Sequence, residues 1–176
     1  RSMNVSPAEA KAYIQYQLGA LEAFCRAAGV QMHHVKPHGA LYNMAAKDEK
    51  LARAIVEGIC EVDDRLTLLA LSGSEMLLAA ERAGLRASEV FADRGYQADG
   101  TLVPRSKPGA MITDETQAIE RVVRMVTEGV VTSIDGIDVP LRADSICVHG
   151  DGEKALLFVQ KIRAALEEKG VALKAL

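Results

Sequence analysis

Apolar residues recur along the chain at helical and strand-like spacings, and these predict alternating elements. Residues 7–28 place their apolar side chains on one stripe of a helix that ends at Gly29. Residues 66–71 form a continuous apolar run, which is typical of a parallel strand covered on both faces. The expected helices are 7–28, 47–62, 74–83, 115–128 and 153–169, and the expected strands are 30–36, 66–71, 85–92 and 145–149.

Two further segments depart from this alternation. Residues 130–141 are predicted to form a hairpin, because Asp135 and Gly136 lie between alternating apolar residues. Residues 93–109 are rich in Gly, Pro, Arg and Asp and are expected to form a long loop, a kind of segment that often binds ligands.

The order of elements predicts an α/β fold with parallel strands. Strand is followed by helix about four times, which favours right-handed crossovers in either an open doubly wound sheet or a (β/α) barrel. Residues 1–176 show no linker, so we expect one domain. The first expected element is a helix begun by Ser6 and Pro7 rather than a strand, and we therefore expect the chain to be the remainder of a longer one.

Composition narrows the function classes. The 176 residues are 49% hydrophobic and 26% charged, with a net charge of -3, as in ordinary globular proteins. Without a Lys/Arg-rich run, nucleic acid is not an expected partner. No apolar run approaches the ~20 residues that span a bilayer, so no membrane association is expected. The three separated cysteines contain no C-x-x-C pair and fit a reducing compartment, which predicts a cytoplasmic protein.

The first candidate for chemistry is the segment that follows the strand expected at 30–36. Alternation places His34 and Lys36 on one strand face, and Gly39 allows a tight turn that leaves His38 and Asn43 on a loop. Lysine offers a cation for an oxyanion or a phosphate, and histidine carries protons near neutral pH. A solvated strand end explains the same residues without any function.

The second candidate is the long loop after the strand expected at 85–92. Arg94 and Arg105 suit carboxylate or phosphate through bidentate contacts. Asp93 suits a proton-accepting role, or it holds Arg94 in an ordinary structural ion pair.

The third candidate is the carboxyl end of the strand expected at 145–149. Here alternation puts Cys147 and His149 on one face, and Asp151 follows, where capping of the last helix also explains it. Cys147 is expected to be a packing residue. A metal site built from His34, His38, His149 and Asp151 has no supporting local spacing such as H-E-x-x-H.

Nucleotide-binding motifs give a negative result. The chain contains neither G-x-x-x-x-G-K-[ST] nor G-x-G-x-x-G. Ser72-Gly73-Ser74 offers either an anion cradle at a helix N-terminus or a simple helix cap.

Taken in order, the three segments resemble the LamB/YcsF family. The matching stretches are 36–43 (Lys-Pro-His-Gly-Ala-Leu-Tyr-Asn), 91–94 with Tyr96, 99–100, 102–105, 108–110 and 147–151 (Cys-Val-His-Gly-Asp). The resemblance implies a (β/α) barrel of the glycosidase/deacetylase type with seven strands. The family's N-terminal Asp-x-Asn-x-Asp motif, on the opening strands of the barrel, is not present in this chain.

The resemblance also implies a reaction and a set of site residues. The reaction is ATP-dependent opening of 5-oxoproline to L-glutamate, with ATP as a magnesium-bound co-substrate, carried out jointly with two partner subunits; a homo-oligomer is compatible with it. The implied catalytic residues are Lys36, His38, Asp93, Arg94, His149 and Asp151, and the implied substrate- or phosphate-binding residues are Asn43, Tyr96 and Arg105.

Two other functions fit the same residues. One is a metal-dependent, deacetylase-like hydrolase, and the other is a non-catalytic subunit that presents the substrate to its partners. All three require the implied catalytic residues to gather around one cavity at the carboxyl ends of parallel strands.

Overall fold

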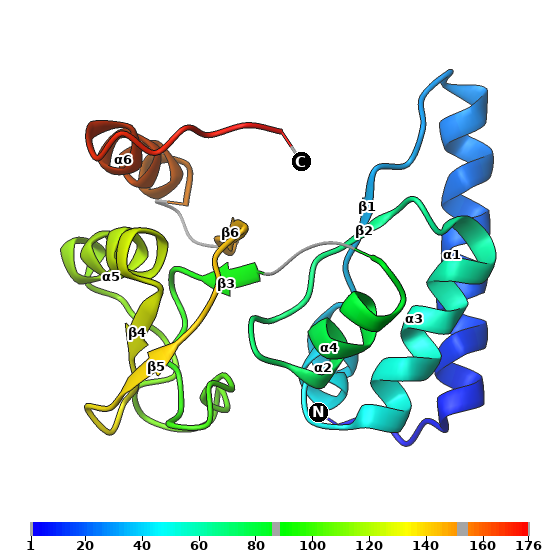
Figure 1. The fold of residues 1–176 in the computed structure, drawn as a ribbon, viewed down its shortest axis with the longest axis horizontal. Coiled ribbons are helices and arrows are strands. Elements are labelled where there is room, and N and C mark those ends of the chain that lie inside the picture. The colour runs from blue at the N-terminus through cyan, green and yellow to red at the C-terminus, as the bar shows by residue number, and fades with distance from the viewer. Residues whose placement is uncertain (1, 86–88, 151–154, 176) are drawn as a thin grey trace. The chain divides into compact units, whose positions relative to one another are not determined.

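The computed structural model describes residues 2–85, 89–150 and 155–175 and divides the chain into two compact units (Figure 1). The N-terminal unit covers residues 1–88, and the C-terminal unit covers residues 89–176.

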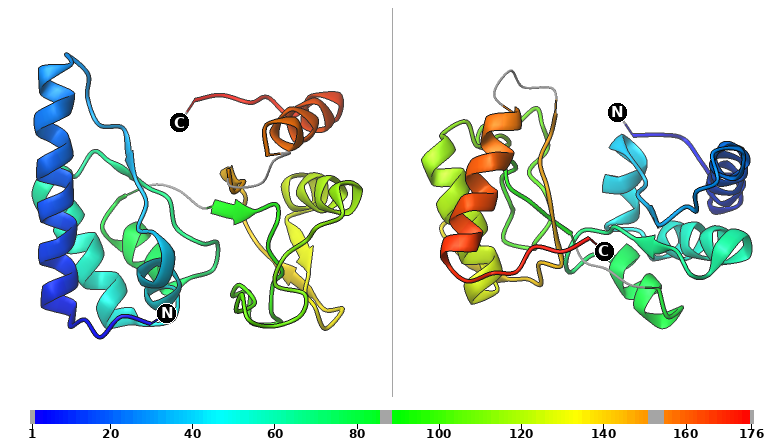
Figure 2. Two further views of the ribbon diagram at one scale, coloured as in Figure 1. Left: turned by 180° about the vertical axis from the view of Figure 1, so that it is seen from behind. Right: turned by 90° about the horizontal axis from the view of Figure 1, so that it is seen from above.

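The N-terminal unit consists mainly of helices. Its elements in chain order are α1 (Pro7–Ala27), β1 (His34–Val35), α2 (Gly39–Ala45), α3 (Glu49–Asp63), β2 (Thr67–Leu68) and α4 (Glu75–Arg82). Helix α3 packs between α1 and α4, and it contributes the fully buried side chains of Leu51, Ile55 and Ile59 to the core (Figures 1 and 2). Strands β1 and β2 pair in parallel, with His34 opposite Thr67.

Side-chain caps fix where these helices begin. The Ser6 hydroxyl accepts a hydrogen bond from the Glu9 backbone N–H, and the Glu9 carboxylate accepts one from the Ser6 N–H, which is a capping box. The Ser74 hydroxyl accepts from the Leu77 N–H at the start of α4. Ser74 is therefore the cap of α4, in agreement with the simpler explanation of Ser72-Gly73-Ser74.

The C-terminal unit is built around a parallel strand pair, a hairpin and two helices. Its elements are β3 (Glu89–Phe91), α5 (Glu115–Glu128), β4 (Val130–Thr132), β5 (Asp138–Pro140), β6 (Ser145–Cys147) and α6 (Ala155–Glu168). Strand β3 pairs in parallel with β6, whereas β4 and β5 form an antiparallel hairpin. Helices α5 and α6 lie side by side (Figure 2), and Val122, Ile162 and Leu166 form the buried core between them and Ala92.

The long loop after β3 is ordered because it pairs with itself. Isolated antiparallel bridges join Arg94 to Met111 and Tyr96 to Leu102. At Gly95 a Cβ atom would lie 2.0 Å from the carbonyl oxygen of Gly109, so the two backbone segments approach more closely than any side chain allows.

Most predicted elements are confirmed, with two differences. The predicted hairpin at 130–141 is present, and Gly136 in its turn has a φ of 77°. The expected strands are longer than the paired ones, since apolar alternation marks extended buried chain whereas pairing also needs a neighbour. The prediction that Asn43 lies on a loop is wrong, because 39–45 forms α2. The part of 153–169 that the structure describes is helical from Ala155.

No helix in the described residues is long and apolar enough to cross a membrane. The prediction of one domain covering 1–176 stays a prediction, as does barrel closure.

Candidate active site

The strongest site geometry lies just beyond the paired ends of β3 and β6. Phe91 lies opposite Cys147 in the register of the two strands, so the residues two positions further along, Asp93 and His149, come to the same edge. The Nδ1 atom of His149 is 2.9 Å from Oδ1 and 2.7 Å from Oδ2 of Asp93. The two side chains, His149 and Asp93, are 25% and 13% exposed, so the pair is partly shielded but reachable.

The imidazole of His149 is held from a second side as well. The Phe91 ring stacks on it with centroids 5.8 Å apart and an interplanar angle of 25°. Since an ionised carboxylate can only accept hydrogen bonds, Nδ1 donates to Asp93 and Nε2 is left to exchange a proton. The arrangement therefore fits an oriented general acid or base.

The Asp93–His149 pair lines a cavity of about 290 Å³. The rest of its described lining is mostly apolar and comes from the end of the long loop, the start of α5, the residue after β6 and the start of α6. These residues are Met111, Ile112, Thr113, Glu115, Ala118, Val148, Ala155 and Phe158. A small, mainly apolar cavity with few polar groups is typical of a site for a small organic ligand.

Arg94 points away from solvent and organises the loop. It is 4% exposed, and its Nε and Nη2 atoms donate to the carbonyl oxygens of Ala110 at 3.1 Å and Val103 at 2.6 Å. Burial, and secondarily the nearby Arg105, lower the pKa of Arg94. These contacts explain Arg94 structurally, and its role in holding ligand charge stays a prediction.

Tyr96 is also a buried component of this loop. It is 1% exposed, and its hydroxyl accepts a hydrogen bond of 2.9 Å from the Phe91 backbone N–H. Burial raises the pKa of this hydroxyl, which keeps it protonated at physiological pH. The guanidinium of Arg121 lies 6.0 Å from the ring centroid and donates to the Arg94 carbonyl oxygen. The buried position gives Tyr96 a role in packing the loop. Contact of its hydroxyl with a substrate stays a prediction.

The N-terminal unit contains the other predicted residues. Lys36 is half-buried, and its Nζ lies 5.5 Å from the centroid of the Tyr42 ring. His38 is exposed at the N-cap position of α2, and Gly39 has the positive φ of 59° that the turn was predicted to need. Asn43 donates from Nδ2 to the Gly39 carbonyl oxygen at 2.9 Å.

The structure thus brings together Asp93 and His149 in one unit. Lys36 and His38 flank Pro37 in the other unit, so a cavity shared by all predicted residues stays a prediction. Arg105 is exposed on a turn of the long loop, and Asp151 lies outside the described residues. Among the residues described, no group of three or more His, Cys, Asp or Glu side chains could hold a metal ion.

Sequence reasoning missed Glu115 as a cavity residue. An acidic residue in the first turn of a helix is common and gave no functional signal. Its ion pair with Lys161, with Nζ 3.0 Å from Oε1, joins residues 46 positions apart and depends on how α5 and α6 pack.

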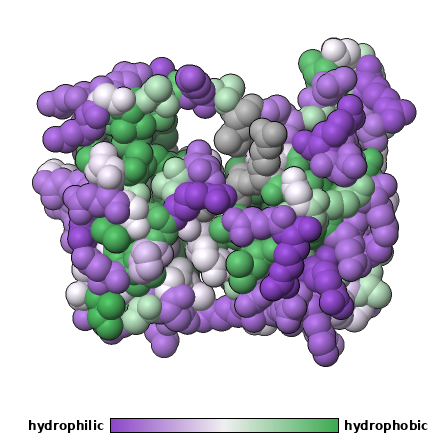
Figure 3. Space-filling view, in the orientation of Figure 1, coloured by the Kyte–Doolittle hydropathy of each residue, from purple (hydrophilic) through white to green (hydrophobic). Residues whose placement is uncertain are grey.

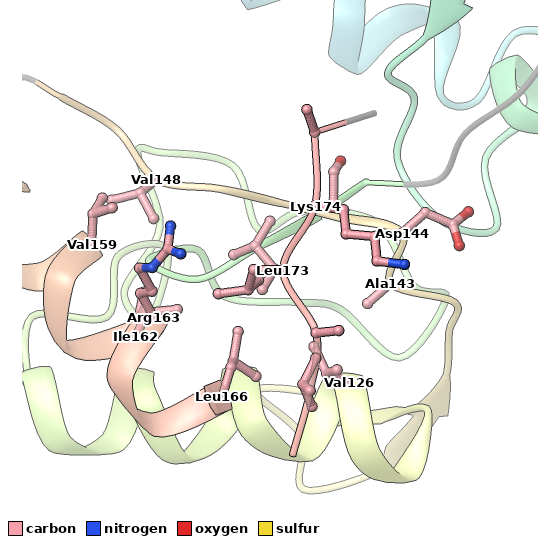
Figure 4. Close-up of a pocket in the computed structure, with 15 residues that line it drawn as sticks. Val126, Ala143, Asp144, Val148, Val159, Ile162, Arg163, Leu166, Leu173 and Lys174 are labelled. Carbon is pink, nitrogen blue, oxygen red and sulfur yellow. The ribbon is translucent and has the colours of Figure 1, made fainter. Parts of the chain in front are cut away.

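A larger cavity of about 670 Å³ lies elsewhere in the C-terminal unit, between α6 and the segment 171–175 (Figure 4). Ile162, Leu166 and Leu173 lie around it, with Arg163 and Lys174 among the other residues that line it. Hydrophobic side chains are also visible at the surface over α6 (Figure 3), where Leu156 is 73% exposed. Of the predicted site residues that the structure describes, none lines this cavity.

Parallel strands with an acid–histidine pair beside a small cavity define the class as an α/β domain with a candidate active site. The chain belongs to the LamB/YcsF family, whose family model matches residues 1–176. This confirms the family resemblance that the three sequence segments carried.

Individual relatives agree with this assignment. The chain is 65% identical over 172 residues to the A subunit of 5-oxoprolinase from Clostridium beijerinckii, covering 97% of this chain and 68% of the relative. It is 56% identical over 172 residues to the corresponding A subunit from Pyrococcus abyssi, covering 97% and 68%. The lactam utilization protein from Thermus thermophilus is 45% identical, with a TM-score of 0.88 over 100% of this chain and 70% of that chain. These likenesses support a barrel-type α/β fold, whereas seven strands stay a prediction.

Proposed function

We propose that this chain functions as one component of an ATP-dependent 5-oxoprolinase, which opens 5-oxo-L-proline to L-glutamate. High identity to proteins named as the A subunit of 5-oxoprolinase supports the assignment. The observation that carries it at the level of chemistry is the Asp93–His149 pair beside the small cavity.

The reaction is difficult because amide resonance makes a lactam carbon a poor electrophile. Transfer of the γ-phosphoryl group of ATP to the lactam oxygen creates a phosphorylated ring, which water can attack at carbon. The ring C–N bond then breaks as the nitrogen takes up protons, which leaves an acyl phosphate. A second water attacks the acyl carbon, and phosphate leaves with the former lactam oxygen. Each of these steps moves protons or negative charge, which side chains can assist.

We assign the proton transfer to Nε2 of His149. Asp93 is the positioning residue, because its two carboxylate oxygens hold Nδ1 and fix which ring nitrogen faces the ligand. His38 and Asp151 are further proton-handling candidates. Lys36, Arg94 and Arg105 are candidates for holding phosphate or carboxylate charge, with Asn43 and Tyr96 as further substrate-binding candidates; Arg105 fits better than Arg94, whose donors meet backbone carbonyls.

ATP, its magnesium ion and two partner subunits complete the proposal. The relatives' name, which specifies one lettered subunit, supports an enzyme of several subunits. We also propose that the assembly works in the cytoplasm, where ATP and reduced thiols are available.

The test is glutamate release by the full-length protein in complex with its partner subunits, with and without ATP. We expect ATP-dependent release, and we expect His149→Ala to lower turnover by roughly 100-fold or more, the usual contribution of a general acid or base. His33→Ala is the matched control, because His33 is an exposed histidine outside the proposed site.

Other outcomes point to the other functions. Glutamate release that needs a divalent metal but not ATP would favour the metal-dependent hydrolase. Full turnover by His149→Ala in an assembly whose isolated chain binds 5-oxoproline would favour the non-catalytic, substrate-presenting role.

A further inference from the structure

Glu115 is the second acidic side chain among the described residues of the Asp93–His149 cavity. It lies in the first turn of α5 and pairs across the helix packing with Lys161 of α6. Both residues of the pair lie on helices, so the Glu115 carboxylate is held more precisely than it would be on a loop, which suits a binding group.

The two carboxylate oxygens of Glu115 are not equivalent. Lys161 Nζ lies 3.0 Å from both oxygens, but its hydrogen bond goes to Oε2. Oε1 is buried and accepts no hydrogen bond from the part of the chain that the structure describes. Oε1 thus has the charge of Lys161 nearby but no directed hydrogen bond, and a further donor would stabilise this buried oxygen atom.

The cavity that Glu115 borders is where such a donor can enter. The side chain as a whole is 32% exposed, and rotation about the terminal bond of a glutamate is soft, so a carboxylate oxygen can turn to a ligand. The neighbouring carboxylate of Asp93 is already used, because both of its oxygens meet His149 Nδ1.

We infer that Glu115 is the acceptor for an N–H group of the ligand, which under the proposed function is the ring N–H of 5-oxoproline. The inference rests on that function for the identity of the ligand. In this arrangement His149 exchanges protons with the amide of the ligand, and Glu115 recognises its nitrogen.

Ring opening makes the contact more favourable as the reaction proceeds. The lactam nitrogen carries one hydrogen, and after the C–N bond breaks it gains protons and becomes the ammonium group of glutamate. A carboxylate beside this nitrogen therefore stabilises the developing positive charge more than the neutral substrate.

The test compares binding of 5-oxoproline with binding of 1-methyl-5-oxoproline, which lacks the N–H, to the protein assembled with its partner subunits. We expect the wild type to prefer 5-oxoproline. Glu115→Ala should weaken 5-oxoproline binding by roughly 10- to 100-fold, the effect of losing a hydrogen bond to a charged acceptor. The preference over the methylated ligand should largely disappear in that variant, measured by calorimetry.

Lys161→Ala is the matched control, because it breaks the same ion pair but keeps the carboxylate. It should retain the preference for the N–H ligand, and Glu115→Gln, whose amide oxygen still accepts, should lie between wild type and Glu115→Ala. Equal loss in Glu115→Ala and Lys161→Ala would overturn the inference, since the ion pair alone would then explain both.

Glutamate release measured in parallel separates this inference from the proposed function. ATP-dependent release with an unchanged ligand preference in Glu115→Ala would overturn the role of Glu115 and leave the function standing. If the wild-type assembly releases no glutamate but prefers 5-oxoproline, and Glu115→Ala abolishes that preference, the result would support the binding role of Glu115 and overturn the proposed function. Absence of any binding or release would overturn both.

Discussion

The hydroxyl of Tyr96 offers a sharp test of how the site is held, through the substitution Tyr96→Phe. The family resemblance implied that this residue contacts substrate, whereas the structure places its hydroxyl 2.9 Å from the backbone nitrogen of Phe91. The substitution removes one oxygen atom and keeps the aromatic ring, so packing in the buried loop is retained.

The expected loss of stability follows from removing the hydroxyl oxygen that accepts the hydrogen bond of the Phe91 N–H. Tyr96 is 1% exposed and Phe91 is 4% exposed, so water does not replace the lost acceptor. Loss of one hydrogen bond typically costs about 0.5–1.5 kcal/mol, and we expect the free energy of unfolding to fall by that amount. The matched control is Tyr16→Phe on α1, since Tyr16 is 77% exposed and surface changes usually stay within about 0.5 kcal/mol.

Urea denaturation followed by circular dichroism measures the difference, and amide hydrogen exchange at Phe91 localises it. We expect faster exchange at that amide in Tyr96→Phe and not in Tyr16→Phe, together with an unchanged KM for 5-oxoproline in the assembled enzyme. A variant that is as stable as the wild type but has a raised KM would refute this reasoning and restore Tyr96 as a substrate-binding residue.

Two further predictions address the loop and the hairpin. Gly95→Ala should destabilise the protein by about 1–3 kcal/mol or more, because the new Cβ meets the rigid Gly109 carbonyl, whereas Gly19→Ala, with open space around it, should not lower Tm. The hydrogen bond from Arg124 holds the pKa of the Asp138 carboxyl at about 2. A lowered pKa stabilises the fold above the unfolded value of about 3.9. The Tm difference between wild type and Asp138→Asn should therefore be constant near neutral pH, shrink as pH falls below about 4, and disappear only below the folded pKa of about 2. A difference that does not shrink between about pH 4 and pH 2 would contradict the ion pair as its cause.

The candidate site could be predicted in part because its residues follow strands. Asp93 and His149 each stand at the carboxyl end of a segment recognisable by its apolar pattern, and parallel strands bring such ends together. Arg94 was predicted from its charge in the long loop, and Tyr96 only from the family resemblance. Neither ground distinguishes a polar group that faces a ligand from one that faces the backbone. Only the folded loop shows that their polar atoms meet Val103, Ala110 and Phe91.

The segment after Pro37 shows an element that the sequence pattern did not predict. Gly39 predicted a turn, and its positive φ confirms it, but the seven-residue helix α2 that follows was too short to show a periodic pattern.

Interactions between residues close together in the sequence determined the positions of the long helices and of the hairpin. Capping side chains such as Ser6, Ser74 and Asp114 act within three residues of themselves, so their effect is readable without a fold. Tertiary structure alone decided that His149 meets Asp93 across 56 positions and that Glu115 pairs with Lys161 across 46. Such contacts depend on the register of β3 with β6 and on the packing of α5 against α6, which no local interaction specifies.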